Sequence, residues 1–540
     1  MHLITVEQMQ AIERAANAGG LSYAQMMENA GNALANTIQI AYGWFKGSAL
    51  GLVGSGNNGG DTLIALTVLA AEHEWQVAAY LAAPRPADDP LLARLRAAGG
   101  AVIALDEDPT GETLAVWAGE YAIWLDGILG TGIRLPLRPE LANLLARLQD
   151  LRREHEPIIY AVDCPSGVNC NTGEVAPQTL RATHTVCMAA AKVGLFTPQA
   201  RPLCGEIEVV EIGLPANLPE WQAMKTFVPD EDWAAEHLPP RPQDADKRTF
   251  GAALIVAGSL NYSGAALLSG RAAFRVGAGW VTLAVPAPLH TALAGHFPEA
   301  TWLLLPHEMG IVNAAAAKVV HENLKRPTAL LVGPGLGMDD GAREFVRSLL
   351  EGSPQDAARP MGFARAPQAP ASSPEGSALP PLIVDADGLK LLAQLSNWSA
   401  RLPKESILTP HVGEMAILTG LKGEAIQAQR LALAQRYAAE WGQVLVLKGA
   451  FTVIAAPDGR TAVLDVATAA LARAGTGDVL AGLMVGLRAQ GVPAFECALL
   501  ACWLHAQAGL RAEQRLGAAS VLAGDVLKQI PKVLKTIGRV

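Results

Sequence analysis

A short run of small residues that ends in an aspartate is the stretch of this sequence best suited to chemistry. Gly475-Thr-Gly-Asp478 is followed by apolar residues at helical spacing, which places Asp478 in the first turn of a helix. The unpaired backbone N–H groups at such a start bind phosphate or a developing anion, and a carboxylate beside them can accept a proton. Taken alone, this pattern fits a plain helix N-cap equally well.

A second polar stretch follows an apolar run near the beginning of the chain. The expected strand 49–53 leads into Gly54-Ser-Gly-Asn57-Asn58-Gly59-Gly60-Asp61, and a helix is expected from about Thr62. The glycine spacing is not that of the dinucleotide fingerprint, and the P-loop lysine is missing. A ligand-binding loop is favoured over a simple turn rich in Gly and Asn, which is the structural alternative.

Two more expected strands of the first half, 121–126 and 158–163, end in carboxylates at Asp126 and Asp163. A single aspartate at a strand end is usually a turn or cap residue. In an open parallel sheet, however, ligands collect beyond the carboxyl ends of the strands. We therefore expect Asn58, Asp126 and Asp163 to share one pocket.

The second half repeats this pattern of buried strand and polar end. Asp385, His411 and Lys448 each follow or join expected strands, on the side where ligands collect. A lone histidine is more often structural, and a lone lysine is more often a solvated charge. At the turn of a strand pair, Lys448 is also placed to meet a nucleotide phosphate.

Length and composition predict at least two α/β domains. The chain has 540 residues, of which half are hydrophobic and few aromatic, which suits buried parallel strands. The net charge of −9 argues against nucleic acid as a partner. No C-x-x-C pair, secretory leader or membrane-spanning apolar run is found, so a soluble cytoplasmic protein without a membrane partner is expected.

The domain boundary is predicted near residue 225. Residues 216–250 are rich in Pro, Trp and charge, which is typical of a linker, so the expected domains are 1–225 and 226–540. A Pro-rich stretch at about 353–381 predicts a mobile, low-complexity insertion on the surface of the second domain.

Four motifs of the first half carry a family resemblance: Met27-Glu-Asn-Ala-Gly31, Asn57–Asp61, Asp126 with Gly130-Thr-Gly132, and Asp163-Cys-Pro-Ser-Gly167. They resemble the NAD(P)H-hydrate epimerase family, which implies a Rossmann-like three-layer fold. The resemblance implies Asp163 as the acid/base residue with Lys192 near it, and K⁺ held by Asn58, Asp126 and Ser166. It also implies that the hydrated nucleotide is bound by Asn57, Asn58, Gly59, Gly60, Asp61, Gly130, Thr131, Gly132, Ile133, Arg134, Leu135 and Pro136.

The second half, from about 247 to 530, carries Asp385, Thr409-Pro-His411-x-Gly-Glu414, Lys448-Gly-Ala450 and Gly475-Thr-Gly-Asp478 in this order. These motifs resemble the ADP/ATP-dependent NAD(P)H-hydrate dehydratase family, which has a ribokinase-like α/β fold. The resemblance implies Asp478 as catalytic base and Mg²⁺ bound with ADP. The implied nucleotide-binding residues are Lys448, Gly449, Ala450, Phe451, Thr452 and Gly477, and the implied hydrate-binding residues are Ala265, Gly335, Gly337 and His411.

One segment departs from the dehydratase pattern. The family carries Asn-x-Gly-Asn-Pro before the Gly-Thr-Gly-Asp motif, whereas this chain has Asp465-Val-Ala-Thr-Ala-Ala-Leu-Ala-Arg473. This difference puts nucleotide contacts from the segment in question.

Together the two resemblances imply repair of hydrated nicotinamide nucleotides by a homo-oligomeric enzyme. The first domain would interconvert the R and S epimers of NADHX and NADPHX. The second would dehydrate the S epimer with ADP, releasing AMP and phosphate. A ribokinase-like small-molecule kinase fused to a non-catalytic nucleotide-binding module is the alternative that the motifs leave open.

Overall fold

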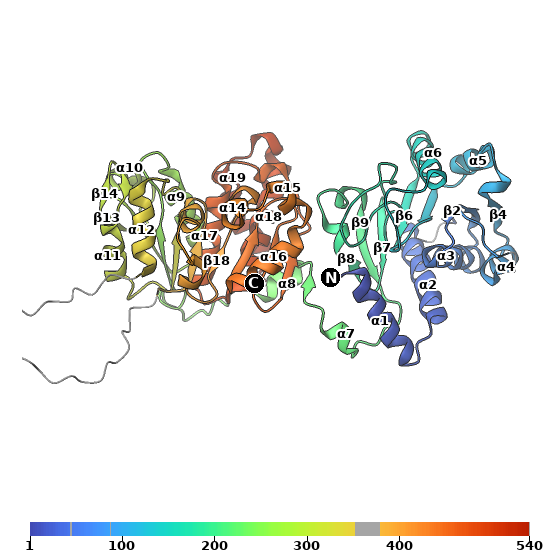
Figure 1. Ribbon diagram of the computed structural model, residues 1–540, viewed down its shortest axis with the longest axis horizontal. Coiled ribbons are helices and arrows are strands. Elements are labelled where there is room, and N and C mark those ends of the chain that lie inside the picture. The colour runs from blue at the N-terminus through green and yellow to red at the C-terminus, as the bar shows by residue number, and fades with distance from the viewer. Residues whose placement is uncertain (44–45, 87, 352–378, 539–540) are drawn as a thin grey trace, which may run out of the picture. The chain divides into compact units, whose positions relative to one another are not determined.

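The computed structural model describes residues 1–43, 46–86, 88–351 and 379–538 (Figure 1). These residues divide into two units, Met1–Val228 and Pro229–Val540. Of the insertion predicted at about 353–381, residues 353–378 lie outside the described part. No helix in the described part has the length and apolar character needed to cross a membrane.

The first unit alternates helices with short strands. Its helices are α1 (Val6–Ala18), α2 (Tyr23–Tyr42), α3 (Asn57–His73), α4 (Pro90–Ala97), α5 (Glu112–Glu120), α6 (Pro139–His155) and α7 (Pro219–Gln222). Its strands are β1 (Leu3–Ile4), β2 (Ser48–Val53), β3 (Gln76–Leu81), β4 (Ala101–Ala104), β5 (Ile123–Gly127), β6 (Ile158–Val162), β7 (His184–Met188), β8 (Ala191–Lys192), β9 (Glu206–Val210) and β10 (Thr226–Phe227).

A seven-stranded parallel sheet in the order β4-β3-β2-β5-β6-β7-β9 forms the centre of the first unit. The strand order reverses between β2 and β5. The loops that follow these two strands therefore leave the sheet on either side of a topological switch point, where open α/β sheets bind ligands. Both predicted substrate segments of the first unit begin there.

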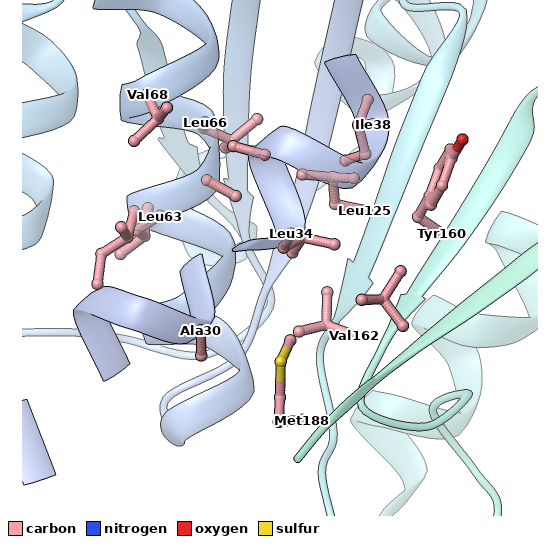
Figure 2. Packing of buried hydrophobic residues seen from close by; sticks show 14 of the residues in the cluster. Ala30, Leu34, Ile38, Leu63, Leu66, Val68, Leu125, Tyr160, Val162 and Met188 are labelled. Atoms are coloured by element: carbon pink, nitrogen blue, oxygen red, sulfur yellow. The ribbon is translucent and has the colours of Figure 1, made fainter. Parts of the chain in front are cut away.

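Helices cover both faces of this sheet, which gives the predicted three-layer α/β arrangement. Ala49 and Val53 of β2 pack in one core with α1 to α4, whereas Leu50 and Leu52 pack in another with α5 and α6. Figure 2 shows part of the first core, in which side chains of α2 and α3 lie against β5, β6 and β7. The alternation follows from the two-residue period of a strand.

The helix expected from about Thr62 begins earlier, so that part of the prediction was wrong. α3 begins at Asn57 with Gly56 as its N-cap, and Asn57–Asp61 form its first turn instead of a loop. A β-carbon at Gly59 would lie 2.1 Å from the Gly54 carbonyl oxygen, so only glycine permits this close return of the chain. The glycine residues that suggested a loop therefore serve tight packing at a helix start.

The second unit has a longer set of elements. Its helices are α8 (Glu231–Glu236), α9 (Gly264–Arg275), α10 (Ala287–Leu293), α11 (Ala315–Glu322), α12 (Asp340–Glu351), α13 (Asp387–Leu392), α14 (Val412–Thr419), α15 (Gly423–Ala428), α16 (Arg430–Trp441), α17 (Thr476–Ala489), α18 (Ala494–Leu516) and α19 (Ala523–Ile537). Its strands are β11 (Ala252–Val256), β12 (Trp280–Pro286), β13 (Thr301–Leu305), β14 (His307–Glu308), β15 (Ile311–Val312), β16 (Ala329–Val332), β17 (Leu382–Val384), β18 (Ile407–Leu408), β19 (Val444–Leu447), β20 (Val453–Ala455) and β21 (Thr461–Val463).

The sheet of the second unit runs in the order β21-β20-β19-β18-β17-β16-β11-β12-β13. Pairing is parallel from β19 to β13, and β20 and β21 continue the sheet as antiparallel strands. The order reverses between β11 and β16, which makes a second switch point. One layer of helices consists of α9, α17, α18 and α19, which pack against one another. A second group of helices in mutual contact consists of α11, α12, α13 and α14. The second unit is therefore also α/β, as predicted.

Candidate functional site

A buried ion pair joins Asp163 and Lys192 at the carboxyl end of the first sheet. Asp163 follows β6 with a φ of 65°, and its Oδ1 accepts hydrogen bonds from the Met188 backbone N–H (3.0 Å) and from the Lys192 ammonium. Lys192 lies on β8, which pairs in parallel with β1 so that Ile4 is opposite Lys192. The start of the chain thus fixes the lysine against the aspartate.

Lys192 is only 1% exposed, and its ammonium also donates to the carbonyl oxygens of Ala190 (3.1 Å) and Met188 (3.4 Å). Burial lowers the pKa of Lys192, but the charge of Asp163 outweighs it and raises the pKa above its usual range. Lys192 therefore stays protonated, which suits it to orienting Asp163 and not to acting as a base.

Two further carboxyls, of Asp61 and Glu13, act on this pair. Burial raises the pKa of Asp61 well above its usual range, and the charges of Asp163 and Glu13 add to the rise. Burial also raises the pKa of Glu13, with Lys192 opposing and Asp163 adding to the shift. Glu13 was missed at the level of sequence. The available signal was its spacing four residues after Met9, on the buried face of α1.

Asp126, Ser166 and Asn58 form a separate buried group next to this pair. The Asp126 carboxylate is fully buried and accepts hydrogen bonds from the Ser166 backbone N–H (2.8 Å) and the Ser166 hydroxyl (2.5 Å). The Asn58 side-chain N–H donates to the Val162 carbonyl oxygen. Its other end faces Gly130, because a β-carbon there would lie 2.5 Å from Asn58 Oδ1. The predicted segments 57–61 and 130–136 thus meet at Asn58 and Gly130.

This second group has the chemistry of an alkali-cation site. Among the described residues, Asp126 has no ion-pair partner, and burial raises the pKa of its carboxyl. Buried carboxylates are normally paired or coordinate a cation, and the oxygens of Asn58, Asp126 and Ser166 are hard ligands. The residues present fit K⁺. No cluster of three His, Cys, Asp or Glu side chains suited to a metal occurs in the described part of the chain.

The remaining predicted substrate residues, Thr131–Pro136, lie in the turn beyond β5 and are partly to fully exposed. Next to this turn, a cavity of about 410 Å³ is lined by residues that include Gly54, Ser55, Ile128 and Leu129. Its lining includes none of the predicted substrate residues. However, its lining residues Gly54, Ser55, Ile128 and Leu129 come shortly before the two predicted segments in the sequence. The cavity offers room for a part of a ligand remote from Asp163.

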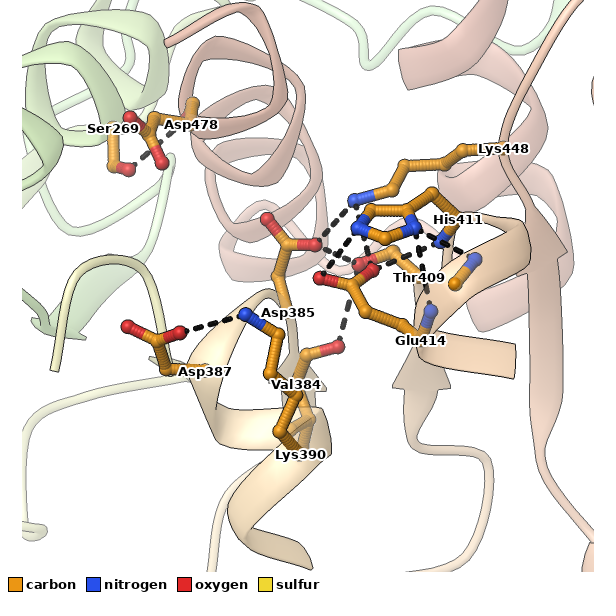
Figure 3. A network of polar contacts seen from close by, with 11 residues as sticks. Ser269, Val384, Asp385, Asp387, Lys390, Thr409, His411, Glu414, Lys448 and Asp478 are labelled. Carbon is orange, nitrogen blue, oxygen red and sulfur yellow. Dashed lines mark hydrogen bonds and ion pairs between the residues drawn. The ribbon is translucent and has the colours of Figure 1, made fainter. Parts of the chain in front are cut away.

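In the second unit, Asp385 and Lys448 form the centre of a polar network (Figure 3). Asp385 follows β17, and its Oδ1 accepts from the Lys448 ammonium (2.7 Å) and the Thr409 hydroxyl (2.6 Å). Glu414 adds a second carboxylate 3.8 Å from Lys448. Burial lowers the pKa of Lys448, but these two carboxylates together raise it above its usual range. The lysine carries a positive charge at the strand end.

His411 caps α14 and faces the same network. Its Nδ1 accepts from the backbone N–H groups of Gly413 (3.0 Å) and Glu414 (3.3 Å), while the His411 backbone N–H donates to the Glu414 carboxylate (2.9 Å). Burial and the charge of Lys448 lower the pKa of His411. A neutral ring with an exposed edge is suited to a hydrogen bond with a ligand.

Asp478 lies in the first turn of α17, as its sequence predicted. Gly475 caps the helix with a φ of 89°, a conformation that favours glycine, and the Ser269 hydroxyl donates to the Asp478 carbonyl oxygen (3.0 Å). Burial, reinforced by the charge of Asp385 and opposed by Lys448, raises the pKa of Asp478 to about 7. The carboxyl is therefore poised to accept or release a proton near neutral pH.

The loops at the second switch point bring two of the predicted hydrate-binding residues, Ala265 and Gly335, into contact. A β-carbon at Gly335 would lie 3.1 Å from the Ala265 side chain, so the two residues are in contact. The Gly337 N–H donates to Asp387 (3.0 Å), whose carboxylate also pairs with Lys390 at 3.0 Å. These contacts hold the 333–337 loop beside the Asp385 strand end.

A cavity of about 730 Å³ lies next to this network. Five of the six predicted nucleotide residues line it, together with His411 and with Thr476 at the start of α17. The predicted residues on its wall are Lys448, Gly449, Ala450, Thr452, Gly477 and His411. Phe451 is instead buried with a φ of 55°, and its side chain is not on the wall. Asp478, Ala265, Gly335 and Gly337 are also absent from the wall.

The segment that departs from the dehydratase pattern, 465–473, also lies along this cavity. Val466–Ala469 and Leu471–Arg473 line it, so the segment occupies the wall despite its different composition. α18 also contributes Cys502, His505 and Ala506 to the lining, and these residues were not predicted from the sequence. No motif marked these three residues, because they lie inside a long apolar helix.

Mg²⁺, which the dehydratase resemblance implies, fits a site completed by the nucleotide. Asp385 and Asp387 are already paired with Lys448 and Lys390, whereas Asp478 has no ion-pair partner among the described residues. Mg²⁺ is usually held by one or two carboxylates plus substrate phosphates and water. The positive start of α17 beside Asp478 favours phosphate and not a cation, so the nucleotide phosphates would be the main ligands of Mg²⁺.

Comparison with known proteins finds a matching family model for each unit. The family model described as YjeF-related protein N-terminus matches residues 23–194. The family model described as NAD(P)H-hydrate dehydratase matches residues 253–354 and 362–532. The two matches fall on the first and the second unit respectively.

Relatives carry both halves on one chain. The bifunctional NAD(P)H-hydrate repair enzyme of Salinibacter ruber is 35% identical over 98% of this chain and 96% of its own length. That of Escherichia coli K12 is 30% identical over 96% of this chain and 91% of its own length. The ADP/ATP-dependent NAD(P)H-hydrate dehydratase of Bacillus subtilis, co-crystallised with ATP/Mg²⁺, is 28% identical; its structure covers 58% of this chain and 100% of that chain, with a TM-score of 0.47.

Proposed function

The chain belongs to the bifunctional NAD(P)H-hydrate repair enzymes, and we propose that each unit carries one of the two repair reactions. The first unit interconverts the R and S epimers of NADHX and NADPHX. The second dehydrates the S epimer with ADP to NADH or NADPH, AMP and phosphate. Two separate groups of buried or half-buried carboxylates carry this proposal, one around Asp163 in the first unit and one around Asp385 and Asp478 in the second.

In the first unit, Asp163 moves a proton at the hydrated ring, and Lys192 holds the Asp163 carboxylate in place. Lys192 is saturated by Asp163 and by two backbone carbonyls, so it fixes the orientation of the carboxylate. Asp61 and Glu13 have raised pKa values beside it, so one of them can carry a proton that Asp163 has removed. The segments 57–61 and 130–136 bind the rest of the nucleotide.

K⁺ in the first unit would be held by Asn58, Asp126 and Ser166. Bound there, it would neutralise the buried Asp126 carboxylate and position the adjoining loops for the negatively charged diphosphate of the substrate. Epimerisation should therefore be lost when K⁺ is replaced by tetramethylammonium and should return when K⁺ is added. The Asp126→Asn variant should show no such response, and a wild-type rate independent of K⁺ would exclude the site.

In the second unit, the ring hydroxyl of the S epimer attacks the terminal phosphate of ADP, which releases AMP. The ring then expels phosphate and loses a proton from the neighbouring ring carbon, which restores the double bond of the dihydropyridine. Asp478, with a pKa of about 7, accepts the hydroxyl proton. Lys448 and the N–H groups at the start of α17 bind phosphate oxygens, and the 333–337 loop and His411 contact the hydrate.

Mg²⁺ bound with ADP would supply positive charge at the transferred phosphate, with the nucleotide phosphates as its main ligands, which leaves Asp478 free to act as the base. The use of ADP as donor rests on the family resemblance. Comparing ADP with ATP at equal concentration tests it, because only a true donor yields AMP or ADP in proportion to the dihydropyridine formed.

The direct test of the function uses purified full-length protein with a mixture of both NADHX epimers, ADP, Mg²⁺ and K⁺. Return of the reduced-nicotinamide absorbance should be complete and should require ADP, after subtraction of spontaneous epimerisation. Recovery that stops at the S share would leave the first unit without epimerase activity. A stable phosphorylated product without recovery would favour the kinase alternative.

The remaining expectations concern the state of the protein in the cell. We propose that it is a cytoplasmic homo-oligomer that acts on small nucleotides and binds no nucleic acid. Cell fractionation tests the location, and light scattering of the purified protein tests the oligomeric state. A monomer at micromolar concentration would contradict the latter.

A further inference from the structure

A buried arginine lies behind the loop 448–452, part of which lines the 730 Å³ cavity. Arg430, the first residue of α16, is 6% exposed. Its guanidinium donates to the carbonyl oxygen of Leu447 (2.8 Å), the residue before Lys448. A β-carbon at Gly449 would lie 3.1 Å from a guanidinium nitrogen of Arg430, so the group also packs against Gly449. Because Gly449 lines the cavity, this guanidinium is one residue away from it.

The charge of this guanidinium has no counter-ion in the described part of the chain. The hydrogen-bond partners of Arg430 are the Leu447 carbonyl and the side-chain oxygen of Gln427 (3.3 Å), which are both neutral. Burial lowers the pKa of Arg430 to about 10, so the group is charged at pH 7. Buried charges are normally paired, so an unpaired one calls for an anion that the protein itself does not supply.

Lys448 lies in the same loop, but its charge is already balanced. Its ammonium is 2.7 Å from the Asp385 carboxylate and 3.8 Å from that of Glu414. The charge of Asp478 also acts on this ammonium. An anionic nucleotide bound beside these three carboxyls therefore needs positive charge from another group, and Arg430 has such charge next to the loop.

The loop also has free hydrogen-bond donors. In the part of the chain that the structure describes, the backbone N–H groups of Gly449 and Ala450 make no hydrogen bond, and both residues are exposed and line the cavity. The Thr452 hydroxyl donates to the Gly449 carbonyl oxygen (2.8 Å), which closes the turn. Free N–H groups in a turn bind phosphate oxygens, and a positive charge behind them strengthens this binding.

We infer that Arg430 is a positioning residue whose charge, acting through the 448–452 loop, balances the phosphates of the bound nucleotide. This inference rests on the proposed use of the cavity for ADP. Arg430 does not itself line the cavity, so its effect depends on the charge of the ligand and not on the base or the sugar. Loss of this charge should therefore weaken the binding of ADP more than that of AMP, and should leave the binding of adenosine unchanged.

The test separates the charge of Arg430 from its hydrogen bond. Arg430→Gln keeps a donor for the Leu447 carbonyl and removes the charge, whereas Arg430→Lys keeps the charge. Arg488→Gln is the matched control, because the Arg488 side chain is only 13% exposed but lies near the end of α17, about 15 Å along the helix from Asp478. Binding of ADP and AMP to the full-length protein is measured by calorimetry, and binding of adenosine by competition with ADP.

Arg430→Gln should bind ADP roughly 10-fold more weakly than wild type, AMP a few-fold more weakly, and adenosine equally well. Arg430→Lys should stay within a few-fold of wild type with all three ligands, and Arg488→Gln should match wild type. An equal loss for ADP and adenosine in Arg430→Gln would assign Arg430 a structural role and overturn the inference. Binding of ADP by Arg430→Gln at wild-type strength would overturn it as well.

Kinetics and thermal unfolding provide further readouts. In Arg430→Gln the KM for ADP should rise by a similar factor while kcat changes less, because the charge acts on the phosphates both before and during their transfer. Without nucleotide, this variant should melt within a few degrees of wild type, since no carboxylate is left unpaired. A variant that no longer folds would overturn the inference. Failure of wild type to bind ADP would instead overturn the proposed function of the second unit.

Discussion

Each unit has a lysine paired with an aspartate at the carboxyl end of its sheet, but the two pairs have different surroundings. The Lys192 side chain is 2% exposed, and its ammonium is bound by Asp163 and by two backbone carbonyls. The Lys448 side chain is 18% exposed and lines a cavity of about 730 Å³ beside Asp385. One ammonium is saturated by the protein, and the other has an open side.

The difference in exposure and bonding indicates different roles for Lys192 and Lys448, which the sequence alone does not distinguish. A saturated, buried lysine has no free N–H for a ligand, so it stabilises and orients its aspartate. A lysine at the edge of a cavity can give its remaining N–H groups to a phosphate. We therefore expect loss of Lys192 to affect mainly folding and orientation, and loss of Lys448 to affect mainly nucleotide binding.

The largest effect is expected for Lys192→Met. Asp163 would be left buried without its partner, which typically costs about 3–5 kcal/mol of folding free energy. Urea unfolding should show this loss, and epimerase activity should disappear with it. The double variant Lys192→Met/Asp163→Asn should recover part of the stability but no activity. A loss below about 1 kcal/mol for the single variant would show that the pair is not buried as described.

The next largest effect is expected for Asp478→Asn. Removing the proton acceptor should lower kcat for ADP-dependent dehydration by about 10²–10⁴-fold, because general base catalysis contributes that much. Epimer exchange, followed by chromatography of the two epimers, should keep its wild-type rate. Dehydration within about threefold of wild type would remove Asp478 from the mechanism.

Lys448→Met should have a smaller effect that falls on ligand binding. The KM for ADP should rise roughly 10-fold, since a hydrogen bond to a charged group contributes about 1.5–3 kcal/mol. Its stability loss should be clearly smaller than that of Lys192→Met, because the pair is partly solvated. Steady-state kinetics and urea unfolding of both variants under one set of conditions measure the contrast. Equal stability losses would contradict the distinction drawn between the two lysines.

The smallest effect concerns pH. Asp478 has a pKa of about 7 in the folded protein against an ordinary value of 3.8, so the folded state binds more protons than the unfolded state between these values. Its contribution to the free energy of unfolding therefore falls as pH rises from about 4 to about 7. Thermal unfolding over this range should show a shallower decline for Asp478→Asn than for wild type. Over the same range, dehydration by wild type should speed up as the carboxylate forms.

The sequence predicted the parts of this fold that depend on local pattern. Buried strands ending in Asp126, Asp163 and Asp385 were readable because an apolar run followed by a carboxylate is a short-range signal. The start of α17 was readable for the same reason, since small residues precede a helical apolar pattern at Asp478. The pattern also placed Lys448 correctly at the turn between β19 and β20.

Tertiary packing decided the residues that the sequence did not reveal. Glu13 lies on the amphipathic helix α1 and His505 lies on the buried helix α18, and only the packing of those helices brings the two residues to a site. Asn57–Asp61 were misassigned as a loop because glycine usually interrupts helices. Here Gly59 is required by the nearby Gly54 carbonyl, and this contact is visible only in three dimensions.

We propose that two independent sites on one chain act in sequence on a substrate that diffuses between them. The most direct measurement mixes equal amounts of Asp163→Asn and Asp478→Asn with both NADHX epimers, ADP, Mg²⁺ and K⁺. Asp163→Asn alone should stop at the S share, Asp478→Asn alone should give almost no dihydropyridine, and the mixture should reach full recovery. A mixture that also stops at the S share would contradict the assignment of the two reactions to these two aspartates.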